Sequence, residues 1–415
     1  MSDVAIDGPA CRISVEHRYE DKVFTLREAR IAEAGLIKGM FDFVYNGKYP
    51  DEELDALAAE ICDQQHNLCV VAVSQPEGRI VGCIMIKIDP QHRIGKGGRG
   101  LVLPEYRRCG LAGATLKLAI DFLCHEAKCV DLVYGASRTV SPGPMRMAAE
   151  GGMVQFGLFP NAVQIESMEH LNLDVYLNPD SIARRRARPA IIPAFKRIYE
   201  LGMHQLGVQE DANLVQLPPL PPARRNLPLP IWNDNPQDVI ARFSRYSEED
   251  RIALSFFPFH DPNAILATDD GGTEVFIWYE GSGKRAAIVG YRSDRKNVQE
   301  ILLSAAQSME ARGAAYLEVL APAADPLMQQ AAYAARFIPC AYFPAMRLAR
   351  DGLRDDFFVL SRTFRLLDFS GVVISPLNAE FLRAYLHGYY ELYIEPLLGP
   401  LSLAPAQDLA TLSTA

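Results

Sequence analysis

Two adjacent arginines and a run of small residues mark the chemically most suggestive stretch of the chain, residues 101–116. An apolar run ends at Pro104, charged residues follow, and apolar side chains then recur at helical spacing. This pattern predicts a strand, a tight loop and the start of a helix. Because the first amides of a helix lack partners and carry partial positive charge, such a loop can hold an anion.

The side chains of this loop suit a pyrophosphate. Gly110 and Ala112 are small enough to let the backbone approach the ligand, and Arg107 and Arg108 can donate charge-assisted hydrogen bonds to its oxygens. The lysine-containing phosphate loop of nucleotide hydrolases and the glycine fingerprint of dinucleotide-binding folds are both absent here. The alternative is an ordinary strand–loop–helix connection whose glycine serves packing alone.

The order of residues in the loop resembles a family signature. Val102-x-Pro104, followed by Arg107-Arg108-Cys109-Gly110-Leu111-Ala112, is similar to the V-x-P and [QR]-x-x-G-x-[GA] motifs of GNAT-type acyl-CoA N-acyltransferases. In that family the loop amides hold the pyrophosphate of coenzyme A. The resemblance implies acetyl-CoA or another acyl-CoA as cofactor, bound by Leu101, Val102, Leu103, Arg107, Arg108, Cys109, Gly110, Leu111, Ala112, Gly113 and Thr115.

The sequence departs from the family at the residue that protonates the departing thiolate. The family commonly carries L-Y-x-x-x-G-F on the helix after the next strand, and alignment on Gly152-Met153 places Ala148 at the tyrosine position. Three alternatives follow: another group supplies the proton, the thiolate leaves toward water, or the chain performs different acyl-CoA chemistry. The sequence leaves these alternatives open.

The candidates for proton transfer on the other side of the thioester are few. The family often uses a Glu or His on the strand before the loop, but residues 90–100 contain no acid. His92 is the first candidate base because histidine titrates near neutral pH, and Asp89 is the second. Ser137 or Ser141 can hydrogen-bond the carbonyl or the acceptor, although Ser141 before Pro142 also suits a helix cap.

Length and composition bound the class of protein. At 415 residues, with 49% hydrophobic and 22% charged residues, the chain is expected to form two globular domains. A net charge of −9 argues against a nucleic-acid surface, and no apolar run has the roughly 20 residues of a membrane helix. The acidic N-terminus lacks the features of a signal peptide, and the eight cysteines include no C-x-x-C pair. We expect a cytoplasmic protein without a metal site.

The order of expected elements agrees with the resemblance. Strands and helices before the loop follow the order β-α-α-β-β-β, which is the order of the family's N-terminal half. We therefore expect an α/β fold with two GNAT-like domains, each a mixed, mostly antiparallel sheet flanked by helices. The proline-rich stretch at 216–230 is the expected linker between domains 1–215 and 231–415. The basic residues of 184–188 are expected to form a solvated patch.

The second domain is expected to have lost the cofactor loop. The order β-β-α-β-α-β-β recurs after residue 270, but residues 293–298 contain neither a proline-ended strand nor a G-x-[GA] motif. The sequence thus favours an acetyl-CoA-dependent N-acyltransferase acting on a small amine, with one cofactor site. Transfer to oxygen or sulfur, decarboxylation and a non-catalytic acyl-CoA-binding protein are the alternatives. The acceptor and the oligomeric state are left open.

Overall fold

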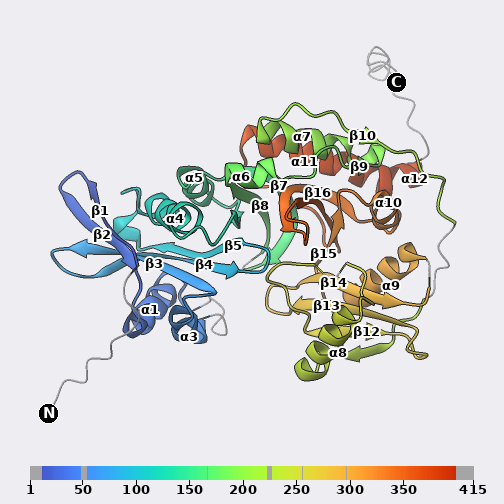
Figure 1. Cartoon of the computed structure of the whole chain (residues 1–415), viewed down its shortest axis with the longest axis horizontal. Coiled ribbons are helices and arrows are strands. Elements are labelled where there is room, and N and C mark those ends of the chain that lie inside the picture. Colours follow the sequence, from blue (N-terminus) through green and yellow to red (C-terminus); the bar gives the residue numbers. More distant parts are fainter. Residues whose placement is uncertain are drawn as a thin grey trace, which may run out of the picture.

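The computed structural model describes residues 12–47, 54–165, 167–221, 227–254, 256–295 and 297–398. The acidic N-terminus, the proline turn at Tyr49-Pro50 and part of the linker lie outside these ranges. The described residues form a fifteen-stranded mixed sheet and a second sheet of two short strands. Helices flank the large sheet (Figure 1), which confirms the expected fold class.

The first half of the chain supplies eight strands in the order β1-β2-β3-β4-β5-β6-β8-β7. Neighbouring strands are antiparallel except β5 and β6, which are parallel. The strands are β1 Ser14–Tyr19, β2 Lys22–Glu28, β3 Asn67–Gln75, β4 Ile80–Asp89, β5 Ile94–Val102, β6 Leu132–Arg138, β7 Val154–Gln164 and β8 Met168–Leu177. Strands β3 and β4 form an antiparallel hairpin, with Gln75 at the end of β3.

The side chains of β4 alternate between the two faces of the sheet, and helices cover both faces in this half. Cys83 and Met85 pack in a core beneath helices α1 and α3, whereas Ile84 and Ile86 pack beneath helix α4. Figure 1 shows these helices on opposite sides of the sheet. The helices are α1 Ala34–Tyr45, α3 Leu57–Cys62, α4 Leu111–Asp121 and α5 Pro142–Glu150.

The second half repeats the strand order of the first. Counted outward from the middle of the sheet, β7-β8-β6-β5-β4-β3 corresponds to β16-β17-β15-β14-β13-β12, and β14 and β15 are again the parallel pair. The strands are β11 Ile231–Asn233, β12 Ala264–Ala267, β13 Thr273–Glu280, β14 Arg285–Ser293, β15 Tyr316–Pro322, β16 Ile338–Leu348 and β17 Arg354–Thr363. The order of elements expected after residue 270 is therefore confirmed.

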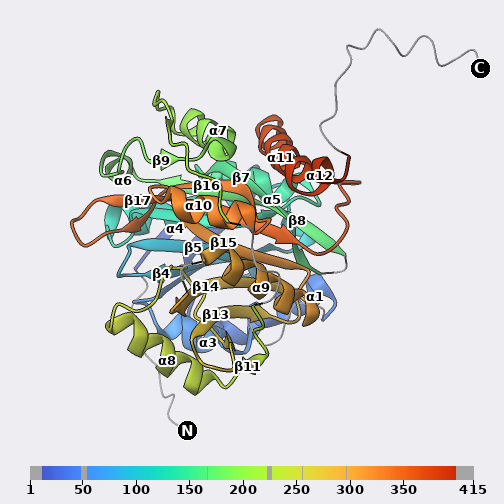
Figure 2. The same ribbon diagram turned by 90° about the vertical axis from the view of Figure 1, so that its right-hand side faces the viewer.

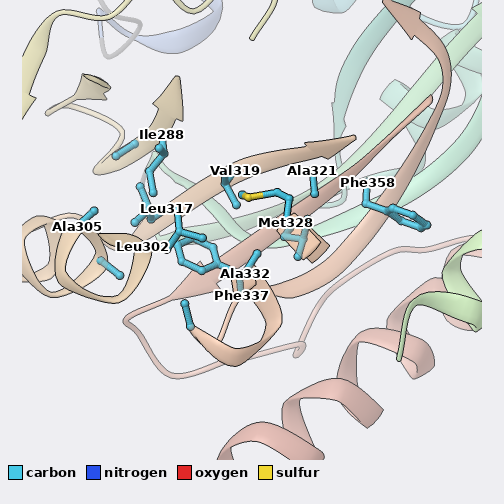
Figure 3. Close-up of a cluster of buried hydrophobic side chains, with 14 of the residues drawn as sticks. Ile288, Leu302, Ala305, Leu317, Val319, Ala321, Met328, Ala332, Phe337 and Phe358 are labelled. Atoms are coloured by element: carbon cyan, nitrogen blue, oxygen red, sulfur yellow. The ribbon is translucent and has the colours of Figure 1, made fainter. Parts of the chain in front are cut away.

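Helices cover the second half on both faces. Helix α8 (Pro236–Glu248) covers one face, and α9 (Val298–Ala311) and α10 (Pro326–Ala334) cover the other. Figure 3 shows the core between α9, α10 and the strands, where Leu302 and Met328 approach Leu317 and Val319. Strand β15 is therefore buried on this side by apolar contacts.

The two halves join through strands β7 and β16. Ala341 pairs with Gly157, and a Cβ atom on Gly157 would lie 2.1 Å from the Cβ of Ala341, so only glycine fits this joint. Beside it, a core cluster combines Ile94 and Leu132 of the first half with strands β15, β16 and β17 of the second. The halves thus share one sheet and one apolar core.

Residues 179–215 pack mainly on the second half. Helix α7 (Lys196–Leu206) lies over β16, beside α11 (Pro376–Tyr389), as Figure 2 shows. Phe195 and Tyr199 belong to the core of the second half. The division at 216–230 therefore stays a prediction, and the packing favours a boundary soon after β8.

The basic run at 184–188 is only in part the expected solvated patch, because Arg186 and Arg188 are exposed but Arg185 is not. The Arg185 side chain is buried, and it donates to Asp356 at 2.6 Å and to Glu210 at 2.9 Å. Arg184 and Arg186 also form ion pairs, with Asp131 and the Asp351/Asp355 pair respectively. These arginines tie the segment to both halves because carboxylates from each half meet it.

No helix in the described part of the chain is long and apolar enough to cross a membrane.

Candidate active site

The predicted loop lies where expected, between the end of β5 and the start of α4. Arg108 and Gly110 both have φ +70°, so the backbone turns sharply before the helix begins at Leu111. No side chain caps this helix start. Within the described residues, the backbone amides of 108–113 donate no hydrogen bond to the protein. The Gly110 carbonyl accepts one from the Ala114 amide. The unbonded amides form a site for an anion.

The structure divides the predicted cofactor residues into three groups. Arg107, Arg108 and Gly110 are exposed, and Val102 and Ala112 are half-buried, so these five can reach a ligand. Gly113 and Thr115 face the protein: a Cβ on Gly113 would lie 2.2 Å from Glu150 Oε2, and the Thr115 hydroxyl donates within α4. Side chains that lie in the core are Leu101, Leu103, Cys109 and Leu111.

His17 is a loop contact that sequence reasoning missed. Its Nε2 atom lies 2.9 Å from the carbonyl oxygen of Cys109, and its ring lies 3.8 Å from the Cβ position of Gly110. Strand β1, which carries His17, lies 92 residues before the loop, so no local pattern links the two. This contact holds one side of the loop in place.

Strands β5 and β6 separate next to the loop. They pair only from Ile94–Leu132 to Gly97–Gly135, although β5 continues to Val102 and β6 to Arg138. Beyond Gly97 the two strands therefore leave an opening between them. Gly98 and Gly100 of β5 are exposed there, so their backbone groups are accessible to an extended ligand.

A bulge in β5 widens the opening. The register with β4 shifts between Cys83 and Met85, where Arg99 adopts φ +52°. The Arg99 side chain then turns toward α3 and pairs with Glu60, which also binds Lys87 at 3.0 Å. Burial opposes ionisation of Glu60, but the hydrogen bonds from Arg99 and Lys87 outweigh it and lower its pKa. Glu60 is therefore held by an ion pair with Arg99 beside the bulge, and its lowered pKa makes it a weak base.

Helix α5 borders the opening from the other face of the sheet. Ala148 is 3% exposed and packs in the core beneath α4, so the position aligned with the family's tyrosine does not face solvent. Ser141 is exposed, and its side chain makes no cap hydrogen bond to α5. The capping alternative for Ser141 is therefore wrong, and a role toward the acyl group stays a prediction.

His92 lies away from the opening. It precedes the paired residues Ile94–Gly97, so the closed end of the strand pair separates it from Gly98. Its Nδ1 atom contacts Asp89 Oδ2 at 2.8 Å, and its ring packs against Phe256 at 4.7 Å between centroids. The hydrogen bonds from His92 outweigh burial and lower the pKa of Asp89. This position gives no support to His92 or Asp89 as the base.

A buried polar network lies under the open end of β6. Asn172 donates to the Ser137 hydroxyl at 3.2 Å, and the buried carboxyl group of Asp174 nearby has one oxygen, Oδ2, without a hydrogen-bond partner among the described residues. Burial raises the pKa of Asp174 to about 6, although Ser137 and Gln155 favour its ionised form. Ser137 is 7% exposed, so its hydroxyl serves this network.

A comparison with protein families identifies a known domain in this part of the chain. Residues 38–138 match the model of the acetyltransferase (GNAT) family. The N-terminal part of the chain therefore contains a GNAT acetyltransferase domain, an acyltransferase that uses acetyl-CoA. The match begins within α1 and ends at the last residue of β6, so it includes both the loop and the opening.

Several solved structures resemble part of the chain. A ribosomal-protein-S5-alanine acetyltransferase from Vibrio fischeri has 18% identity and a TM-score of 0.35, covering 40% of this chain and 98% of its own. A spermidine N-acetyltransferase from Vibrio cholerae, in complex with CoA and spermine, has 16% identity and a TM-score of 0.33, covering 37% and 95%. A GNAT-family acetyltransferase from Streptococcus pneumoniae has 17% identity and a TM-score of 0.33, covering 37% and 99%. No curated protein matches the sequence.

Proposed function

We propose that the chain transfers the acetyl group of acetyl-CoA to the nitrogen of a small amine, at the opening between β5 and β6. The observation that carries this proposal is the separation of the strands beside a helix start with unbonded amides. The loop would hold the pyrophosphate while the extended arm of the cofactor pairs with Gly98 and Gly100. The thioester would then lie near Gly97, where the strands meet.

We further propose that the second half is a degenerate GNAT-like domain that binds no coenzyme A. Its strand order supports the likeness, whereas its helix starts differ from those of the first half. Asn297 accepts a hydrogen bond from the Glu300 amide at the start of α9, and Asp325 accepts one from Met328 at the start of α10. These side chains take the places that phosphate oxygens would need.

The second opening is also occupied by the chain itself. Strands β14 and β15 stop pairing at Ile288–Val319, and Ala253 then pairs with Tyr291 through backbone hydrogen bonds of 2.9 and 3.0 Å. A Cβ on Gly290 would lie 2.6 Å from Ile252, so this segment packs tightly against β14. A pocket of about 520 Å³ remains beside it, and its lining includes both Asp325 and Arg347.

Calorimetric titration with coenzyme A tests the cofactor site, and one equivalent per chain is expected. Ala112→Leu should weaken binding at least tenfold, about 1.4 kcal/mol, because the larger side chain would fill the space beside the amides. Ala127→Leu, at an exposed position where the same helical segment ends, is the control and should bind normally. Unchanged affinity in a folded Ala112→Leu protein would refute the site.

Turnover is measured with acetyl-CoA and a panel of primary amines while free thiol is followed. Thiol release that depends on the amine supports transfer to nitrogen. Tight binding of coenzyme A without such release would contradict the proposed reaction and favour a binding protein.

A further inference from the structure

Acetyl transfer to an amine requires a group that takes the proton of the nitrogen. Strand residues 94–102 and 132–138, which border the opening, contain no Asp, Glu or His. Two carboxylates lie on the walls, but Glu60 is held by Arg99 and Glu169 accepts two hydrogen bonds from Arg138, at 2.6 and 2.7 Å. The two strands that border the opening thus supply no base, and Asp174 of β8, which lies under β6, is only 2% exposed.

The second half brings a carboxyl group to the same level of the sheet. Tyr316 of β15 packs with Leu171, whose strand partner is Arg138 beyond the separation. Leu320 of β15 belongs to the core cluster that contains Leu132, at the paired end of β6. Because alternate residues of a strand face the same way, Glu318 lies between these two levels. That level is where β6 leaves β5.

The surroundings of Glu318 suit a proton acceptor. The Tyr316 hydroxyl donates a hydrogen bond to Glu318 Oε2 at 2.9 Å. Lys96 of β5 and Arg285 of β14 are near enough to act on the carboxyl group electrostatically. Glu318 is half-buried, so part of the residue stays exposed. Tyr134 and Cys340 are the other titratable groups whose ionisation this carboxylate affects.

Burial raises the pKa of Glu318, although Tyr316, Arg285 and Lys96 favour its ionised form. A carboxylate with a raised pKa is a stronger base than an ordinary one. His260, whose ring packs 4.5 Å from that of Trp278, is also near Lys96 and Arg285. Burial and these two cations lower the pKa of His260 well below its usual range, which makes it the weaker base.

We propose that Glu318, from the second half, accepts the proton of the amine that reacts at the opening of the first half. This assignment rests on the proposed function above. The neutral amine attacks the thioester carbonyl, the C–N bond forms, and the C–S bond breaks with its electron pair on sulfur. The nitrogen proton passes to the Glu318 carboxylate, directly or through one water. Solvent protonates the thiolate, and Glu318 returns its proton to solvent.

Glu318→Gln tests the assignment with an amine that the wild-type protein acetylates. In this variant kcat should be about 10²-fold lower or more, and coenzyme A affinity should be unchanged. The rise of kcat/KM with pH on the acid side of the profile, which we call the acid limb, should disappear because Glu318 no longer ionises. Glu391→Gln is the matched control, because Glu391 also accepts a hydrogen bond from a tyrosine, Tyr333, at 2.6 Å. Both variants are compared by thermal unfolding.

Tyr316→Phe keeps the assignment testable if Glu318→Gln fails to fold. Loss of the hydroxyl removes a hydrogen bond that favours the Glu318 carboxylate, so the acid limb should move to higher pH. A folded Glu318→Gln protein with the wild-type rate and pH profile, or an unmoved limb in Tyr316→Phe, would overturn the role of Glu318 while acetyl transfer stands. Absence of wild-type turnover with every amine would overturn the proposed function and this assignment together.

Discussion

Replacing Asp131 by Asn should strongly destabilise the contact between the two halves. Asp131 is 3% exposed and lies directly before the first residue of β6, Leu132. Its carboxylate accepts hydrogen bonds from Arg93 of the first half at 2.8 Å, from Arg184 of the segment after β8 at 2.7 Å, and from Arg354 of the second half at 2.9 Å. The substitution keeps the shape of the side chain and removes its charge.

The magnitude follows from the exposure of the three arginines. The side chains of Arg93 and Arg184 are 35% and 36% exposed. Loss of either ion pair with Asp131 should therefore lower the free energy of unfolding by no more than about 1 kcal/mol. The Arg354 side chain is 0% exposed, and its other acceptors are backbone carbonyls, including that of His92 at 3.0 Å. Burial already lowers the pKa of Arg354 to about 10. An uncompensated cation there should cost about 3–5 kcal/mol.

Thermal unfolding at pH 7 measures this loss, and a decrease in Tm of roughly 10 °C is expected. Asp351→Asn is the control, because Asp351 also pairs with an arginine but is 52% exposed, and its Tm should change little. The arginines outweigh burial and lower the pKa of Asp131, so its stabilisation should be lost as the pH falls through that lowered value. Equal Tm values for the two variants would refute the reasoning.

Three further outcomes are expected. Because the pKa of Asp174 is raised to about 6, the folded protein holds a proton that the unfolded chain releases above about pH 4. Stability should therefore fall by about 3 kcal/mol between pH 4 and 7, and Asp174→Asn should abolish this fall in urea titrations. Gly113→Ala should cost about 1–3 kcal/mol in the same assay, since its Cβ would meet Glu150, whereas Gly143→Ala, with no contact under 3.4 Å, should not destabilise. His17→Ala should weaken coenzyme A binding about threefold to tenfold in calorimetry, by releasing the loop; full affinity would exclude that role.

The sequence predicted the parts of the fold that depend on local patterns. The run to Pro104 and the small residues after Arg108 predicted a strand, a loop and a helix, and these are β5, the loop and α4. Helix α5, whose start the sequence indicates by Ser141 before Pro142, begins at Pro142. Such elements are predictable because periodicity, proline and glycine act within a few residues of themselves.

Features that depend on distant contacts could not be read in the same way. Strand β8 carries polar side chains such as His170, Asn172 and Asp174 on a buried face, so its sequence lacks the usual apolar alternation. The charge of Arg185 predicted exposure, but carboxylates from elsewhere in the chain cover it. Glu318 approaches the opening only because two halves share a core, and no spacing in the sequence indicates that.

The joint between β7 and β16 gives the chain the arrangement of a dimer with both subunits on one polypeptide. In a dimer of identical chains, any substitution appears on both sides of the interface. Here the two sides can change independently: the start of α4 in the first half has no side-chain cap, whereas Asn297 caps the start of α9 in the second. Gly157 fixes this association, because any larger residue would push the two sides apart. Covalent linkage also makes their pairing independent of protein concentration.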